Sequence, residues 1–243
     1  MDHSFRYCQL MQDKTRLIHV GPLVEYDTLK RCGVVYAMLN ALPVNIQTSK
    51  AYFGPQQSVF YPQVSEMKNR DLEKMINRTI MQQTKQLIQQ QAGDIPTPIE
   101  EMIGSYEIKN NQRNILSMSL SNYAYHYHAA HGMTYIKSLT FDLKKGKLCA
   151  LQNLFKPGSD YVERLSAIIQ SQIKQRNIPL LNGQVRIGPN QDFYIADKAL
   201  VIFFQLYEIT PYVFGFPMFP ISVYDIQDII DENGPLGRMA VNN

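Results

Sequence analysis

The segment from Ile115 to His128 places the strongest constraint on the fold of this chain. Its first half alternates apolar residues with serines, in the order Leu116, Ser117, Met118, Ser119, Leu120 and Ser121. Successive side chains of a β-strand point to opposite faces, so this alternation predicts a strand with one apolar and one polar face. Such a strand needs neighbours that pair with its backbone and a second layer that covers its apolar face.

Neighbouring segments supply these partners. The residues Asn110 to Arg113 have turn character and follow the apolar segment Met102 to Lys109, which favours a β-hairpin with the strand after them. A third strand begins after Gly132 and continues to Leu143. Four further strands are expected: Val44 to Thr48, Val59 to Pro62, Leu200 to Leu206 and Ile221 to Val223. The third is apolar apart from Gln205, which is typical of a central strand that is buried on both faces.

Two longer helices and one short helix are expected. Lys68 to Gln91 carries an apolar stripe at helical spacing, formed by Leu72, Ile76, Ile80 and Leu87. A second helix follows Pro157–Gly158, where Asp160 and Glu163 have the spacing of a capping box. Tyr224 to Asp231 is expected to form the short terminal helix. Because strands and helices are grouped, we predict an α+β fold, with a mainly antiparallel sheet packed against one long and one shorter helix and with a short C-terminal helix.

The first 41 residues differ from the rest of the chain. They mix charged and apolar residues without a sustained period, apart from one short helical pattern from Asp27 to Leu42. We therefore expect an N-terminal extension at residues 1–41 and a single α+β module at residues 42–243. A module of this length can bury a hydrophobic core without disulfides or structural metals.

Charge, cysteines and apolar runs narrow the class of partner and the compartment. The net charge is only +3 and the basic residues are scattered, so nucleic acid is not an expected partner. Three widely spaced cysteines, Cys8, Cys32 and Cys149, favour free thiols in a reducing compartment. No stretch approaches the roughly 20 apolar residues of a membrane span, and the apolar run Cys32 to Leu39 lies too far into the chain for a signal peptide. We predict a cytoplasmic protein, with the cell envelope or the spore as the alternative.

Three of the five histidines lie close together, at His126, His128 and His131. On a continuous strand His126 and His128 point to the same face, and a turn that brings His131 under them completes a three-nitrogen zinc site with an open position. This arrangement defines the alternative function, a zinc-dependent hydrolase in which the metal activates a bound water. Because no carboxylate lies close in sequence to orient these ligands, we favour the simpler interpretation of polar residues at a strand end.

Aromatic residues form two candidate binding surfaces. Tyr123 and Tyr125 continue the phase of the serines and face away from His126. A row of aromatic rings there either stacks on a sugar or a base or packs in the core or under a helix, and we favour the packing interpretation. The passage from Pro211 to Pro220 either folds onto the core or forms an exposed interface. Its aromatic residues are Tyr212, Phe214, Phe216 and Phe219. The ligand-binding candidates are therefore Tyr123, Tyr125, His131, Tyr212, Phe214 and Phe216.

Signatures of catalysis are weak. The chain contains no P-loop, dinucleotide-binding fingerprint or nucleophile elbow. Cys149 has no nearby histidine in sequence that would activate it as a nucleophile. We predict a protein without enzymatic activity and without a cofactor, and the sequence leaves its oligomeric state open.

Short segments from Leu42 to the C-terminus resemble, in their order and spacing, a bacterial family of domains of unknown function. The segments are Phe60–Val64, Ile76–Asn77, Ala130–Gly132, Leu139–Leu143, Gly146–Lys147, Leu154–Phe155, Phe193–Ile195, Leu200–Phe204, Tyr207–Ile209, Pro211–Tyr212 and Gly215. The family is that of the extracellular domain of RsiV and the N-terminal module of PdaC.

The resemblance implies a non-catalytic α+β module at or outside the envelope of a Gram-positive bacterium, in contrast to the cytoplasmic location predicted above. In this family the RsiV domain binds lysozyme as a sensor, and the PdaC module accompanies a separate catalytic domain. The resemblance therefore implies a binding or sensor module for a muramidase (lysozyme) or a peptidoglycan-related ligand, so that the partner is a protein or a cell-wall glycan. It transfers no ligand-contacting residue to this chain.

Overall fold

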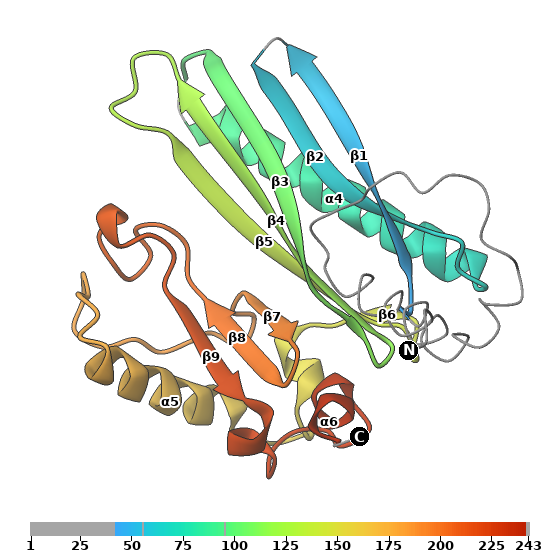
Figure 1. Ribbon diagram of the computed structural model, residues 1–243. Coiled ribbons are helices and arrows are strands. Elements are labelled where there is room, and N and C mark those ends of the chain that lie inside the picture. The colour runs from blue at the N-terminus through green and yellow to red at the C-terminus, as the bar shows by residue number, and fades with distance from the viewer. Residues whose placement is uncertain (1–41, 55, 95, 242–243) are drawn as a thin grey trace, which may run out of the picture. The chain divides into compact units, whose positions relative to one another are not determined.

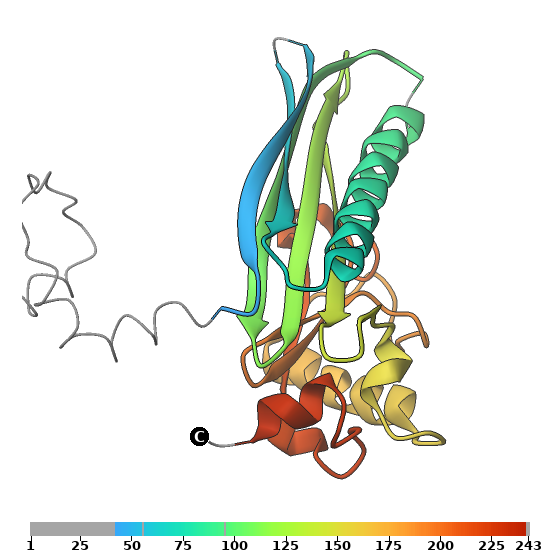
Figure 2. The ribbon, with the colours of Figure 1, turned by 90° about the vertical axis from the view of Figure 1, so that its right-hand side faces the viewer.

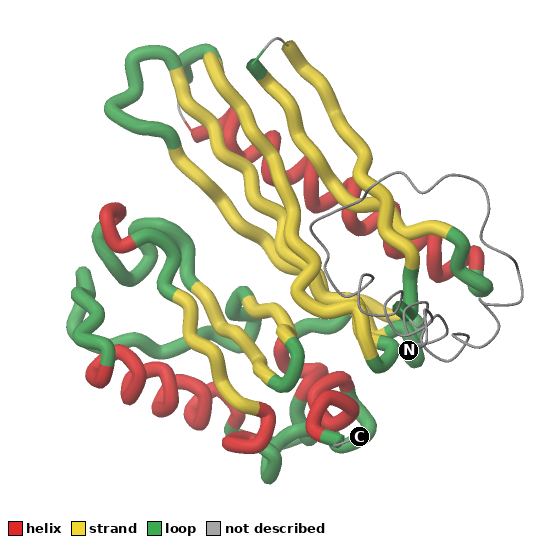
Figure 3. The backbone as a smooth tube through the Cα atoms, in the orientation of Figure 1, coloured by secondary structure: helices red, strands yellow, loops and turns green. Residues whose placement is uncertain are grey.

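The computed structural model describes residues 42–54, 56–94 and 96–241 of the 243-residue chain. The extension at residues 1–41 and the short helical pattern that ends at Leu42 lie outside the described residues, apart from Leu42 itself. The described part has a six-stranded and a three-stranded sheet together with three α-helices (Figure 3). This is an α+β fold, as predicted.

The strands of the larger sheet follow one another in chain order. They are β1 (Asn45–Gly54), β2 (Gln57–Ser65), β3 (Ile99–Gln112), β4 (Ile115–His126), β5 (Met133–Asp142) and the two-residue β6 (Lys147–Leu148). Neighbouring strands are antiparallel except β2 and β3, which are parallel over three residue pairs. The helix α4 (Arg70–Asp94) connects this parallel pair and lies along one face of the sheet (Figures 1 and 2).

Helix α4 covers the apolar face that the alternation in β4 predicts. In the core cluster between them, Leu72, Ile76, Ile80 and Leu87 pack with Leu116, Met118 and Leu120. The helix begins after Asn69, whose Oδ1 accepts a hydrogen bond from the Leu72 N–H at 3.0 Å. Asn77 binds both backbone groups of Val64 in β2, because its Oδ1 accepts from the Val64 N–H at 2.8 Å and its Nδ2 donates to the Val64 carbonyl at 2.9 Å. Asn77 thus acts as a strand neighbour for β2 beyond the last β2–β3 pair.

The β3–β4 hairpin differs from the prediction at its turn. The ladder continues to the pair Gln112–Ile115, and the turn consists of Arg113 and Asn114, whose φ angles are 52° and 57°. Positive φ at both central residues is typical of the tight turns that suit the twist of a two-residue hairpin. The predicted turn at Asn110–Arg113 therefore begins too early.

The smaller sheet packs on the face of the larger sheet that α4 leaves open. The elements that follow β6 are η1 (Leu151–Leu154), α5 (Tyr161–Gln175), β7 (Phe193–Ala196), β8 (Ala199–Phe203), η2 (Tyr212–Phe214), β9 (Met218–Ser222), η3 (Val223–Ile226) and α6 (Pro235–Ala240). The central strand β8 is buried on both faces, as its apolar run predicts: Leu200 packs with α5, and Phe203 packs with Ile136 of β5. The polar face of β4 receives β7, because Ser117 Oγ accepts a hydrogen bond from the Ile195 N–H at 3.0 Å.

Two predictions in the C-terminal part are wrong. Asp160 is the N-cap residue of α5 but its side chain makes no capping hydrogen bond, and Glu163 instead forms an ion pair with Arg186. The terminal helix does not occupy Tyr224 to Asp231, which holds the 3-10 helix η3 and turns. It is α6, which begins with Pro235 at a position where proline's missing N–H is not needed.

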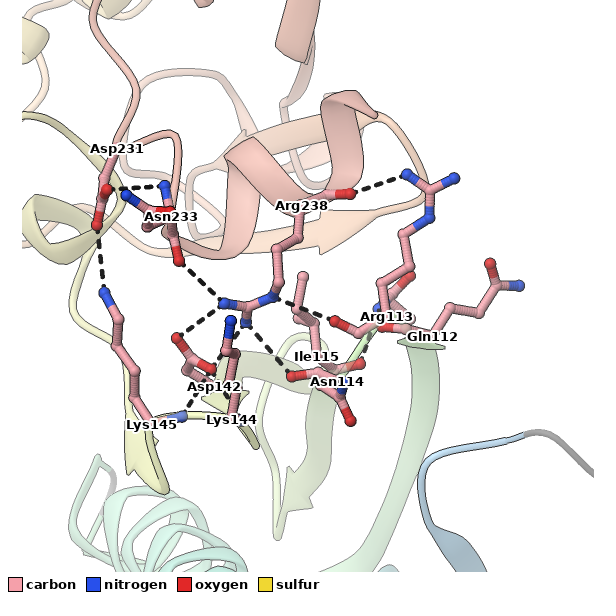
Figure 4. Close-up of polar contacts among 11 residues, drawn as sticks. Gln112, Arg113, Asn114, Ile115, Asp142, Lys144, Lys145, Asp231, Asn233 and Arg238 are labelled. Carbon is pink, nitrogen blue, oxygen red and sulfur yellow. Dashed lines mark hydrogen bonds and ion pairs between the residues drawn. The ribbon is translucent and has the colours of Figure 1, made fainter. Parts of the chain in front are cut away.

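Helix α6 is fixed by a buried ion pair (Figure 4). The Nη2 atom of Arg238 lies 2.8 Å from Oδ1 of Asp142, whose side chain is fully buried. The Arg238 Nε donates to the Arg113 carbonyl at 3.2 Å, and Arg113 Nη1 donates back to the Arg238 carbonyl at 2.8 Å. The two arginines therefore hold α6 against the turn of the β3–β4 hairpin.

Candidate functional site

An aromatic site forms where the β4–β5 loop meets the segment that follows β8. We define it as Tyr123, Tyr125, His131, Tyr207 and Tyr212. The rings of His131 and Tyr212 are stacked, with centroids 4.3 Å apart and planes at 29°. The ring of Tyr207 lies 5.4 Å from that of Tyr212. The site therefore joins residues that are about 80 positions apart in the chain, from β4 and the β4–β5 loop on one side and from the segment between β8 and β9 on the other.

The hydrogen bonds of His131 hold its ring in place. Its Nδ1 lies 3.0 Å from the Gly132 carbonyl and its Nε2 lies 3.2 Å from the Tyr207 hydroxyl. A carbonyl oxygen only accepts, so Nδ1 donates to Gly132, and Nε2 can accept from the Tyr207 hydroxyl. One tautomer of the neutral imidazole thus satisfies both contacts.

Gly132 sits between two tyrosines. A Cβ atom at this position would lie 2.1 Å from the ring of Tyr123, and the Tyr212 hydroxyl donates to the Gly132 carbonyl at 3.0 Å. A side chain at this position would displace the Tyr123 ring from this packing. Tyr123 lies on the face of β4 away from α4, and burial, followed by the nearby Glu101 carboxylate, raises the pKa of its hydroxyl. The Tyr125 hydroxyl donates to the Ala129 carbonyl at 3.1 Å and so ties the loop to β4.

The outer rim of the site is apolar and exposed. Tyr207, Val213 and Phe214, which we call the exposed patch, have exposed fractions of 46%, 92% and 36%. Tyr207 adopts the left-handed region with φ of 63°, which is uncommon for a bulky residue and costs conformational energy. This strained backbone directs the Tyr207 ring toward His131, so the patch is built on a preorganised support.

The structure brings together four of the six ligand-binding candidates: Tyr123, Tyr125, His131 and Tyr212. Phe214 belongs to the exposed patch beside them, whereas Phe216 is half-buried and Phe219 is a core residue of β9. Helix α4 lies on the opposite face and does not cover Tyr123 and Tyr125, which are half-buried beside the β4–β5 loop. Sequence reasoning missed Tyr207 as a binding candidate, since its role depends on a backbone conformation that a tyrosine rarely adopts.

The geometry required by the zinc alternative is absent. His126 is buried beside α4, where Nδ1 lies 2.8 Å from the Thr97 carbonyl and Nε2 lies 2.9 Å from the Gln91 carbonyl. The strand ends at His126, and His128 is exposed with a φ of 61°, so the two side chains do not share a strand face. Within the described ranges, no three His, Cys, Asp or Glu side chains lie close enough together to hold a metal ion.

Cys149 offers no reactive thiol. Burial, followed by the nearby Asp142 carboxylate, raises the pKa of this thiol. A raised pKa disfavours the thiolate, which is the nucleophilic form of cysteine. Separately, none of the helices in the described residues is long and apolar enough to cross a membrane.

Two family models match adjacent parts of the chain. Residues 50–134 match the model "Deacetylase PdaC", and residues 152–224 match "Protein of unknown function (DUF3298)". The first match covers most of the larger sheet with α4, and the second covers α5 with the smaller sheet. The aromatic site draws Tyr123 and His131 from the first match and Tyr207 and Tyr212 from the second.

Two curated bacterial proteins and two crystal structures are similar to the chain. The anti-sigma-V factor RsiV of Bacillus subtilis is 28% identical over 191 residues, which is 70% of this chain and 63% of RsiV. The peptidoglycan-N-acetylmuramic acid deacetylase PdaC of the same organism is 22% identical over 176 residues, which is 68% of this chain and 37% of PdaC. A DUF3298 family protein from Bacteroides fragilis superimposes with a TM-score of 0.62 at 13% identity, over 83% of this chain and 99% of that structure. A second one, from Pseudomonas aeruginosa, superimposes with a TM-score of 0.55 at 16% identity, over 84% of this chain and 99% of that structure.

These matches confirm the resemblance to the family that links the RsiV and PdaC modules. The two crystal structures show that the fold is shared. The chain spans less than two thirds of either curated relative. The similarity to RsiV and to PdaC supports a regulatory or binding domain.

Proposed function

We propose, from this kinship, that the chain is a non-catalytic binding module that contacts a protein partner through the exposed patch. The observation that carries the proposal is the exposure of Val213, 92% of whose surface is open to solvent beside Tyr207 and Phe214. Exposed apolar residues that gather in one place are typical of protein interaction sites. Aromatic residues in such sites often carry a large share of the binding energy.

The support beneath the patch suits this role. The His131–Tyr212 stack and the His131–Tyr207 hydrogen bond hold the patch in one conformation before a partner arrives. Preorganisation lowers the entropy cost of binding, because fewer side chains and loops must be ordered on association. The first candidate partner is a muramidase such as lysozyme, the class that the family resemblance implies.

Calorimetry with lysozyme, and separately with soluble peptidoglycan fragments, tests the proposal. We expect saturable binding of lysozyme that Val213→Asp weakens at least tenfold, because the substitution places a charge in the centre of an apolar contact. Val241→Asp is the matched control, since it makes the same change at a valine that is 61% exposed and lies next to α6. If the chain binds peptidoglycan fragments and not lysozyme, the partner is a cell-wall glycan and the muramidase proposal is wrong. If Val213→Asp and Val241→Asp weaken binding equally, the exposed patch is not the binding surface.

The cellular location is a separate prediction. The sequence favours the cytoplasm, whereas a muramidase partner favours the envelope. Cell fractionation combined with mapping of the N-terminus of the mature protein distinguishes them, and cleavage near Asn40 and Ala41 would overturn the cytoplasmic prediction.

A further inference from the structure

Gln205 links the segment that carries Tyr207 to the edge of the larger sheet. Its Oε1 accepts a hydrogen bond from the Ile136 N–H at 3.1 Å, and its Nε2 donates to the Ile136 carbonyl at 2.7 Å. A single side chain therefore satisfies both outward-facing backbone groups of one residue in β5. The same Nε2 also donates to Asp192 Oδ2 at 3.2 Å, which in turn forms an ion pair with Lys137 at 2.8 Å.

These bonds join the two chain segments that carry the aromatic site. Ile136 is five residues beyond His131 and belongs to the strand that follows the His131 loop. Gln205 is two residues before Tyr207, and its own N–H donates to the Glu208 carboxylate at 2.6 Å, which closes the turn that contains Tyr207. The pairing of the Gln205 side chain with β5 therefore sets how the segment that carries Tyr207 and Tyr212 lies relative to the His131 loop.

We propose that Gln205 is the positioning residue of the aromatic site, and that the site takes its binding conformation only while this amide is paired with β5. The proposal deepens the proposed function, on which its binding part rests. An amide is required because only an amide side chain offers one donor and one acceptor at the spacing of a strand neighbour. Asn77 forms the equivalent pair with Val64 at 2.8 and 2.9 Å, far from the aromatic site.

The test compares Gln205→Met with Asn77→Leu. Each variant replaces a paired amide with an apolar side chain of similar size, so each loses two backbone hydrogen bonds. The readout is the NMR signal of the His131 ring protons, which the stacked Tyr212 ring shifts upfield. We expect Gln205→Met to move these signals toward those of an unstacked histidine and to speed exchange of the Ile136 amide, whereas Asn77→Leu should leave them in place and affect the Val64 amide.

Lysozyme binding provides the second readout. We expect Gln205→Met to weaken it about tenfold and Asn77→Leu to leave it unchanged, in line with the loss of site geometry. Unchanged His131 signals in Gln205→Met would overturn the positioning role, whether or not lysozyme binds. Absence of binding by the unsubstituted chain would refute the proposed function and leave the NMR test intact. If Gln205→Met does not fold, Gln205→Glu replaces it, because the carboxylate keeps the acceptor but repels the Ile136 carbonyl and Asp192.

Discussion

Substitution of Gly132 by alanine tests the packing of the aromatic site directly. The new Cβ would lie 2.1 Å from Cε2 and 2.3 Å from Cζ of Tyr123. Carbon atoms in contact are normally about 3.5–4.0 Å apart, so the Tyr123 ring or the loop must move by more than an ångström. The obstructing atoms form the far end of the half-buried Tyr123 side chain, which can turn aside. We therefore expect a loss of about 1 kcal/mol, plus about 1 kcal/mol if the Tyr212–Gly132 hydrogen bond breaks.

Urea unfolding measures this loss, provided that the slope of the transition stays the same. Gly183→Ala is the matched control, because no atom lies within 4 Å of a Cβ there and its φ is not in the left-handed region. The control should unfold within about 0.5 kcal/mol of the unsubstituted chain or be slightly more stable. An unchanged unfolding midpoint for Gly132→Ala, together with unchanged NMR signals of the Tyr123 ring protons, would refute the close approach of Tyr123 and with it the described geometry of the site.

Three further outcomes are expected. Arg238→Met should cost about 3 kcal/mol in urea unfolding, because the fully buried Asp142 carboxylate loses the Arg238 guanidinium as its cationic partner and keeps the Lys144 and Lys145 N–H bonds. A loss below about 1 kcal/mol would contradict this ion pair. Cys149 should react with a thiol reagent only after unfolding. Because the pKa of this thiol is raised in the folded state, its contribution to stability is complete below the unfolded pKa of about 8.5 and falls as pH rises above that value. Cys149→Val should remove this decline. The purified protein should carry no stoichiometric zinc and keep its Tm on chelation; stoichiometric zinc that is lost in His128→Ala would restore the hydrolase alternative.

Hydrophobic period was enough to predict the main layers of the fold. The stripe of α4 and the alternation in β4 both arise from burial of one face, and they meet each other in the core. The uniform apolar run Leu200 to Phe203 likewise corresponds to a strand covered on both sides. The sequence reveals these elements because burial of one face, or of both faces, requires apolar side chains at a fixed spacing.

The errors arose where backbone conformation or distant partners decide the structure. The turn of the β3–β4 hairpin depends on positive φ at Arg113 and Asn114, residues that less often adopt it than glycine does. Helix α6 has only six residues and depends on the Arg238–Asp142 pair, whose members are 96 positions apart. Isolated helices of that length are unstable in water, so their local sequence is a weak predictor.

The candidate site divides in the same way. The two-residue period of a β-strand placed Tyr123 and Tyr125 on the face opposite His126. It could not show that Tyr207 and Tyr212 contact His131. That meeting depends on the docking of the smaller sheet on β5. The three histidines do not converge as the zinc alternative requires, because the strand ends at His126, and side-chain period alone does not predict where a strand ends.

NMR titration of the isotope-labelled chain with lysozyme tests whether this module binds a muramidase through the exposed patch. We expect saturable shifts of backbone amides around His131, Tyr207 and Val213, with α5 unaffected. An absence of saturable shifts, or shifts confined to α5 and its neighbours, would contradict the claim that this module binds a muramidase through the exposed patch.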